Sequence, residues 1–150
     1  MAEIDQKAPV KSGTEVEIEA SPEVVWDVLT TFEAWPSWNP DVKSMDFQGG
    51  LAPGSEFRWR AGPSRLVSTL QRVEAPRAIE WTGRTTSIKA LHIWRLEPRN
   101  GNTLVRSEES FDGLLARLLR GPLQKTLDKS LEKGLQHLKA EAERRARSSD

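Results

Sequence analysis

Residues 123–138, LQKTLDKSLEKGLQHL, predict the architecture of this protein. Leucines recur there every three or four positions, which places them on one face of a long amphipathic helix: Leu123, Leu127, Leu131, Leu135 and Leu138. Such a leucine face needs an apolar partner surface, and in this chain only one face of a β-sheet is large enough. The stretch therefore predicts an α+β domain in which a sheet packs against a C-terminal helix.

The segment before this helix, from Val42 to Phe111, is mostly strand-forming. Strand-forming stretches follow one another at 55–60, 65–74, 78–82, 89–96 and 103–111, and apolar and polar residues alternate cleanly in 55–60. Turn signals such as Pro53-Gly54 and Asn100-Gly101 separate them. Because the connections are short, we expect an antiparallel, meandering sheet.

The N-terminal part adds a strand and helical material. Val16 to Ala20 alternates as a half-buried strand does, and Ser21-Pro22-Glu23 then begins a helix. Serine is a good N-cap, proline fits the first helical position, and an acid suits the first turn. Pro36 and Pro40 limit the next segment to a short helix or turn.

Length and composition restrict the class of protein. The 150 residues fit one domain, for which we predict a flexible tail over 1–13 and a ligand-binding domain over 14–147. The absence of cysteine excludes a disulfide scaffold and a thiolate metal site. Because 22 basic residues balance 22 acidic residues, the chain has no net charge that would attract nucleic acid or anionic lipid. No stretch reaches the ~20 apolar residues of a membrane span, and the polar start is unlike a signal peptide, so we expect a cytoplasmic protein.

A set of motifs covers residues 14–143. It consists of ASPEVVWDVL at 20–29, Phe32, Trp35-Pro36, Trp38-Asn39-Pro40, and the ending Leu131…Gly134-Leu135. These motifs resemble the polyketide cyclase/dehydrase family of the START-related helix-grip superfamily (SRPBCC). The resemblance implies a curved antiparallel sheet of six to seven strands wrapped around the long C-terminal helix, as in START and birch-pollen-allergen proteins. It also implies a small apolar ligand.

The resemblance also implies which face of strand 89–96 points inward, a choice that two apolar faces leave open. Similar sequences carry inward residues at the positions of His92, Trp94 and Leu96. Pairing through the Asn100-Gly101 turn is then expected to join four residue pairs: Leu96 with Thr103, Trp94 with Val105, His92 with Ser107, and Ala90 with Glu109. Ser107 and Glu109 would therefore also point inward.

Aromatic residues are the main functional signal. Six tryptophans and no tyrosine are many for a small core, so they either fill the core or line an apolar cavity. The ligand-binding set predicted on the second interpretation comprises Phe32, Trp35, Trp38, Trp59, Trp81, His92, Trp94, Ser107 and Glu109. Within it, His92 and Glu109 are candidate acid/base residues, unless they only satisfy each other.

Other chemistries lack support. Ser107 and Glu109 lie two apart on one strand, and the spacing argues against a catalytic triad; a nucleophile elbow is also missing. The two histidines, His92 and His137, lie on different elements, so no metal site is expected, and no P-loop or other cofactor motif occurs. Arg58, Arg60, Arg65 and Arg72 are expected to face solvent.

The sequence therefore predicts binding of a small hydrophobic, lipid- or polyketide-like molecule in a cavity between sheet and helix. One alternative is a cyclase or dehydratase that uses the same pocket. A second alternative is a co-chaperone-like interaction module that uses the leucines of residues 114–119. We expect a monomer or homodimer that binds no nucleic acid.

Overall fold

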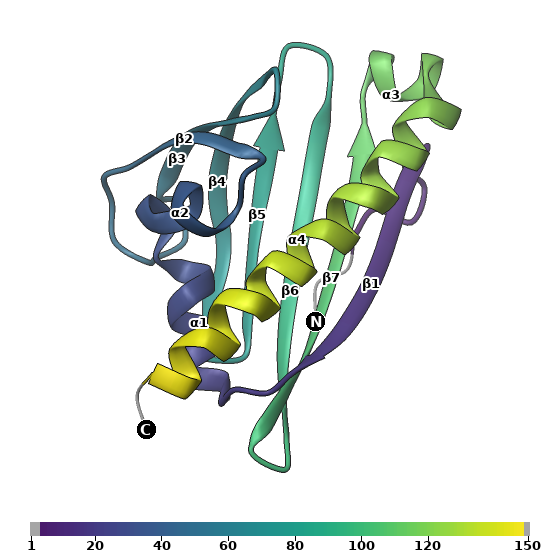
Figure 1. Ribbon diagram of the computed structural model, residues 1–150. Coiled ribbons are helices and arrows are strands. Elements are labelled where there is room, and N and C mark those ends of the chain that lie inside the picture. The colour runs from purple at the N-terminus through teal and green to yellow at the C-terminus, as the bar shows by residue number, and fades with distance from the viewer. Residues whose placement is uncertain (1–3, 149–150) are drawn as a thin grey trace.

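The computed structural model describes residues 4–148 and contains a seven-stranded antiparallel sheet (Figure 1). The strands are β1 (Val10–Ile18), β2 (Val42–Phe47), β3 (Glu56–Ala61), β4 (Ser64–Glu74), β5 (Ala78–Arg84), β6 (Lys89–Arg99) and β7 (Asn102–Asp112). Their order is β1-β7-β6-β5-β4-β3-β2, so β2 to β7 form a meander and β1 joins β7. The predicted antiparallel sheet is confirmed.

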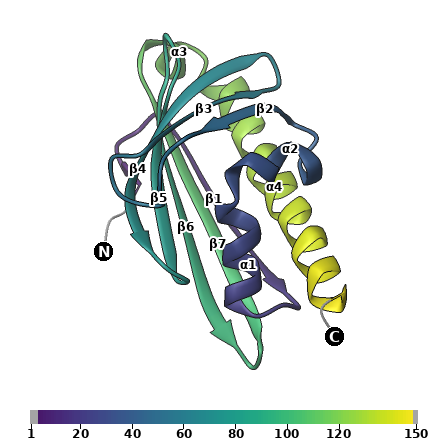
Figure 2. The ribbon, with the colours of Figure 1, turned by 90° about the vertical axis from the view of Figure 1, so that its left-hand side faces the viewer.

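The helices lie on one face of this sheet, which we call the inner face (Figure 2). They are α1 (Pro22–Thr30), the 3-10 turn η1 (Phe32–Ala34), α2 (Trp35–Trp38), α3 (Leu114–Leu118) and α4 (Arg120–Ser148). Helix α4 runs diagonally across the inner face, and α1 and α2 close one side (Figures 1 and 2). The predicted helix-grip architecture is confirmed. None of the helices within residues 4–148 is long and apolar enough to cross a membrane.

The leucine stripe packs α4 onto the sheet as predicted. Leu127, Leu131, Leu135 and Leu138 are at most 3% exposed, and Ala142 extends the stripe by another turn. Gly121 and Pro122 do not end a helix. Both lie in the first turn of α4, where proline needs no amide hydrogen. The chain bends instead at Leu119, two residues before Gly121, with φ −117° and ψ 41°.

The predicted start of α1 is confirmed. Ser21 is the N-cap, and its side chain accepts a hydrogen bond from the Val24 amide at 3.3 Å. The preceding turn is fastened to the sheet, because the buried Thr103 hydroxyl donates to the Ala20 carbonyl at 2.7 Å. Together these bonds fix α1 beside the β6–β7 turn.

The domain begins earlier than predicted. Strand β1 starts at Val10, which pairs with Phe111, so residues 10–13 of the expected tail belong to the sheet. Ile4 and Ala8 are also buried, at 6% and 7% exposure. The alternation was missed because Ser12 and Thr14 occupy inward positions that usually hold apolar residues. Residues 1–3 of the predicted tail lie outside the described residues.

The outer face of the sheet carries the arginines. Arg58, Arg60 and Arg65 are exposed, as expected, whereas Arg72 is half-buried between Glu74 and Glu80, at 2.8 and 3.3 Å. Glu108 also lies on this face, where it binds Arg95 at 2.6 Å. Its neighbour Glu109 points inward, since successive strand residues alternate.

Candidate functional site

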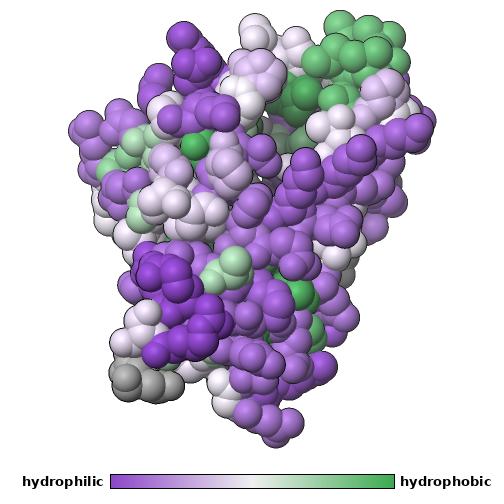
Figure 3. All heavy atoms as spheres, in the orientation of Figure 1, coloured by the Kyte–Doolittle hydropathy of each residue, from purple (hydrophilic) through white to green (hydrophobic). Residues whose placement is uncertain are grey.

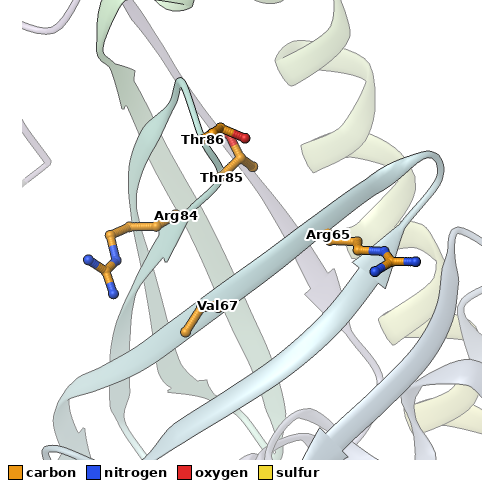
Figure 4. Close-up of a pocket in the computed structure, with 5 residues that line it drawn as sticks. All are labelled: Arg65, Val67, Arg84, Thr85 and Thr86. Atoms are coloured by element: carbon orange, nitrogen blue, oxygen red, sulfur yellow. The ribbon is translucent and has the colours of Figure 1, made fainter.

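Three of the hollows at the surface of residues 4–148 open on the outer face of the sheet. The largest, of about 530 Å³, is bordered by charged residues of β4, β6 and β7 that include Arg72, Arg95 and Glu108. The others, of about 360 and 310 Å³, lie along β3 and β4 and past the end of β5. Figure 4 shows the smallest, where Arg84 points away from Arg65. Because ion pairs satisfy much of this charge, we regard the outer face as a solvated surface.

The inner face carries a polar cluster of His92, Ser107 and Glu109. The His92 Nε2 atom lies 2.7 Å from the Ser107 Oγ atom, and the His92 Nδ1 atom lies 3.5 Å from the Glu109 Oε1 atom. Ser107 is fully buried, whereas the side chains of His92 and Glu109 remain 13% and 16% exposed. The structure thus brings together the three predicted polar residues and leaves two of them accessible.

The strand pairing behind this cluster differs from the predicted pairing by two residues. His92 pairs with Glu109, Trp94 with Ser107 and Leu96 with Val105. A two-residue turn with positive φ at Asn100 and Gly101 makes Arg99 the partner of Asn102, which fixes this register. A shift of two residues preserves the face, because side chains alternate with period two, so the inward orientation was predicted correctly.

Burial sets the protonation of the pair. Desolvation lowers the pKa of His92 from its ordinary 6.5 to about 3. The same effect raises the pKa of Glu109 from 4.5 to about 8. At neutral pH the imidazole is therefore uncharged and the carboxyl group holds its proton. The cluster offers a hydrogen-bond donor and a proton acceptor side by side in an apolar setting.

The spacing of Ser107 and Glu109 predicted that these residues could not form a triad-like arrangement with His92. That prediction is wrong, because the His92 ring lies between the two side chains. The reason is that His92 lies directly opposite Glu109 and diagonally from Ser107 on the same face, so that its ring reaches both side chains. Ser107 is nevertheless an implausible nucleophile, since it is fully buried in mid-strand. The backbone amides beside it belong to the β6–β7 ladder, which leaves none to form an oxyanion hole.

Two predicted tryptophans contact the cluster. The Trp94 ring stacks on the His92 ring with centroids 4.8 Å apart, and the Trp81 ring meets the imidazole edge-on at 5.3 Å. Trp94 is 6% exposed, and its indole Nε1 atom is buried with no hydrogen-bond partner among the described residues. A buried donor in this state costs free energy unless another group accepts from it.

The remaining predicted aromatic residues gather on the α1–α2 side. Phe32, Trp35 and Phe57 pack ring on ring, with the Phe32 and Phe57 centroids 4.5 Å apart, and Trp81 joins them. Phe32 and Trp35 are 0% and 5% exposed, which fits the core-filling interpretation for that side. Their contact with a ligand stays a prediction.

Trp38 and Trp59 are only half-buried. The Trp59 indole donates to the Ser68 hydroxyl at 3.0 Å, while the Trp38 Nε1 atom is buried without a partner among the described residues. Ser68 was missed by the sequence analysis, although its place on the strand paired with β3 put it on the face of Phe57.

The inner face is incompletely covered near α3. Its floor there consists of small residues, because a Cβ atom on Gly83 would lie 3.5 Å from the Ala90 Cβ and 3.8 Å from the Ser68 Oγ. Leu66 and Phe111, also on inward positions, are only half-buried. The space-filling view shows the surface hollowed between the α3–α4 corner and the strands (Figure 3). Gly83 and Ser68 were not predicted site residues, though strict alternation from Trp81 places Gly83 inward.

The described residues do not form a cluster suited to metal binding. Within residues 4–148, no group of three or more histidine, aspartate or glutamate residues could hold a metal ion. His92 and Glu109 are the titratable side chains of the inner cluster, and desolvation favours their neutral forms.

A curved antiparallel sheet that holds a long C-terminal helix, with a polar cluster on a largely apolar inner face, defines a START-like helix-grip protein. The chain belongs to the polyketide cyclase/dehydrase and lipid transport family, whose profile matches residues 9–143. None of the curated proteins matches this sequence.

Solved structures share the fold at low sequence identity. A hypothetical protein from Helicobacter pylori superimposes with a TM-score of 0.83 at 14% identity, over 95% of this chain and 97% of the other. A START superfamily protein from Mycobacterium smegmatis gives 0.76 at 20%, over 93% and 99%. The ZhuI aromatase/cyclase from Streptomyces sp. R1128 gives 0.77 at 17%, over 93% and 96%. These similarities establish the fold alone.

Proposed function

We propose that the protein binds a small, mostly apolar molecule between the inner face and the α3–α4 corner, with a polar group of that molecule directed to His92 and Glu109. The observation that carries this proposal is a desolvated yet partly exposed His92–Glu109 pair on an apolar face. Membership of a lipid transport and cyclase family supports the same class of ligand.

The chemistry of the pair favours an uncharged polar group on the ligand. A neutral imidazole and a protonated carboxyl group can each hydrogen-bond a carbonyl or hydroxyl group. A carboxylate ligand would find no fixed positive charge there, since the pKa of His92 is about 3. Ketones and alcohols should therefore bind better than the fatty acids of equal length.

The test is a titration of matched C12 ketone, alcohol and carboxylate ligands at pH 7, followed by tryptophan fluorescence and checked by calorimetry. Ala90→Leu, which fills the floor beside Gly83, should weaken binding of the ketone about tenfold, because an added side chain occupies the ligand volume. Arg58→Ala, on the outer face, is the matched control and should change nothing. No saturable binding of any of the three ligands would refute the proposal.

A second candidate, an acid/base enzyme of the cyclase or dehydratase type, is favoured by a neutral imidazole and a protonated carboxyl group that lie side by side. His92 would take a proton from carbon next to a ligand carbonyl, and Glu109 would give its proton to the carbonyl oxygen. Glu109→Gln should then abolish turnover of a polyketone while leaving its affinity within a fewfold. If a bound polyketone is recovered chemically unchanged from the wild-type protein, the enzyme candidate is refuted and the binding function remains.

A further inference from the structure

Three leucines at the α3–α4 corner face solvent. Leu114, Leu118 and Leu119 are 71%, 70% and 44% exposed, and we call them the leucine patch. They form the apolar area at the upper right of the space-filling view (Figure 3). An apolar cluster kept in water marks a binding surface more often than chance.

The topology brings two hairpin turns to the same end of the molecule as the leucine patch. In the antiparallel meander, the β3–β4 turn, the β5–β6 turn and the end of β7 share one sheet end. Gly113 ties α3 to the β5–β6 turn, because a Cβ atom there would lie 2.6 Å from the Ser87 carbonyl oxygen. The patch therefore sits directly beside residues 85–88.

This end is cationic although the chain is neutral overall. The sequence contains no acid within 57–73, 81–96 or 113–127, the segments that meet here. They contribute exposed cations to this end: Arg60, Arg65, Arg84, Lys89, Arg117, Arg120 and Lys125. The acids that border it include Asp41, Asp46, Asp112 and Asp128. Asp46 lines an outer-face hollow with Arg60 and Arg65, and Asp112 pairs with Arg117 at 3.1 Å. The balanced composition thus conceals a segregation of charge that only the fold creates.

We propose that the leucine patch and these seven cations, the basic rim, form a docking surface for an anionic lipid bilayer. The leucines enter the boundary between headgroups and acyl chains, and the rim attracts anionic headgroups over about one Debye length, ~8–10 Å. A second copy of the chain is a poorer partner, because it would bring two cationic rims together. The surface goes beyond the ligand site and does not depend on it.

Vesicle co-sedimentation tests the apolar part. Wild-type protein should bind phosphatidylcholine vesicles containing 30% phosphatidylglycerol about tenfold more strongly than phosphatidylcholine alone, because the rim adds electrostatic attraction. The Leu114→Ser/Leu118→Ser variant should lose at least about tenfold of that binding. Leu51→Ser is the matched control, since Leu51 is 40% exposed in the β2–β3 loop at the opposite end, and it should stay within about twofold.

The basic rim is tested in the same assay. Arg84→Gln/Arg120→Gln should weaken binding to the anionic vesicles several-fold and reduce its salt dependence. The control is Arg77→Gln/Arg99→Gln, two exposed cations at the opposite sheet end, which should bind like wild type. All variants should keep the wild-type circular dichroism spectrum and Tm, because the mutated side chains are exposed.

The docking proposal would be overturned by no binding to anionic vesicles at low salt, by equal losses in test and control variants, or by a leucine-dependent dimer in light scattering without vesicle binding. The last result would assign the patch to a second copy. Capture of an acidic protein by the patch, with vesicle binding absent, would equally overturn it. Each result leaves the ketone titration unaffected, so this surface and the ligand site fail independently.

Discussion

The His92 Nδ1 atom lies 3.5 Å from the Glu109 Oε1 atom, on two paired strands that turn both side chains toward the inner face. Desolvation shifts the two pKa values in opposite directions, to about 3 and about 8. A basic residue and an acidic residue are therefore both neutral at pH 7. This pairing dictates how the stability of the protein should depend on pH.

We expect stability to pass through a plateau between pH 4.5 and 6.5. The pKa of His92 is near 6.5 in the unfolded chain and about 3 in the folded protein. The unfolded state therefore binds more protons below pH 6.5, and the free energy of unfolding falls as the pH falls toward 3. The pKa of Glu109 is near 4.5 in the unfolded chain and about 8 in the folded protein. The unfolded state therefore releases its proton first, and the free energy of unfolding falls as the pH rises from 4.5 toward 8. The opposed slopes cancel in between.

Above pH 6.5 only the Glu109 loss remains, at about 1.4 kcal/mol per pH unit up to pH 8. Urea unfolding across pH 4–9 measures it. Glu109→Gln should remove the alkaline decline, because glutamine mimics the protonated acid. The variant should match wild type near pH 4, below the unfolded pKa of 4.5, and exceed it increasingly as the pH rises toward 8. An alkaline decline of the same steepness in the variant would show that another group causes it.

Trp94→Phe should weaken ligand binding by roughly two- to tenfold, the value of one hydrogen bond, if the free indole donates to the ligand. Stability should hardly fall, because the variant also removes a buried donor without a partner. Calorimetry with the C12 ketone measures the first effect and urea unfolding the second. If wild-type protein binds the ketone and the Trp94→Phe variant binds it with the same affinity, the ligand does not contact Trp94.

Gly113→Ala should destabilise the fold by about 1–3 kcal/mol, since φ is +108° and the new Cβ would meet the Ser87 carbonyl at 2.6 Å. The matched control is Gly134→Ala inside α4, where a Cβ would meet nothing within 4 Å. That substitution should stabilise the protein by up to about 1 kcal/mol through helix propensity. Chemical unfolding of both variants decides, and two changes of the same sign would contradict the prediction.

Ser21→Ala should cost about 1 kcal/mol by removing the N-cap bond to the Val24 amide. Ser37→Ala is a suitable control, because its exposed hydroxyl only donates to the Ala34 carbonyl. Thermal unfolding should show a lower Tm for the cap variant alone.

Features that depend on neighbouring residues were predictable. The α4 stripe, the Ser21 cap and the meander follow from periodicity and turn chemistry, and each is found in the structure. The inner position of His92 and Glu109 was also predicted, because alternation survives an error of two residues in register. Where polar residues interrupt the pattern, as at Ser12, the start of β1 was missed.

Properties that require distant segments of the chain to meet could not be predicted from periodicity and turn chemistry. The sequence determined which side chains share a strand face and that a leucine-faced helix must cover a sheet. Only the tertiary structure decided that His92 lies between Ser107 and Glu109, how strongly both titrating groups are desolvated, and that three acid-free segments converge beside exposed leucines. Periodicity acts within one element, whereas electrostatic environment sums over every element packed nearby, and that sum exists only once the chain has folded.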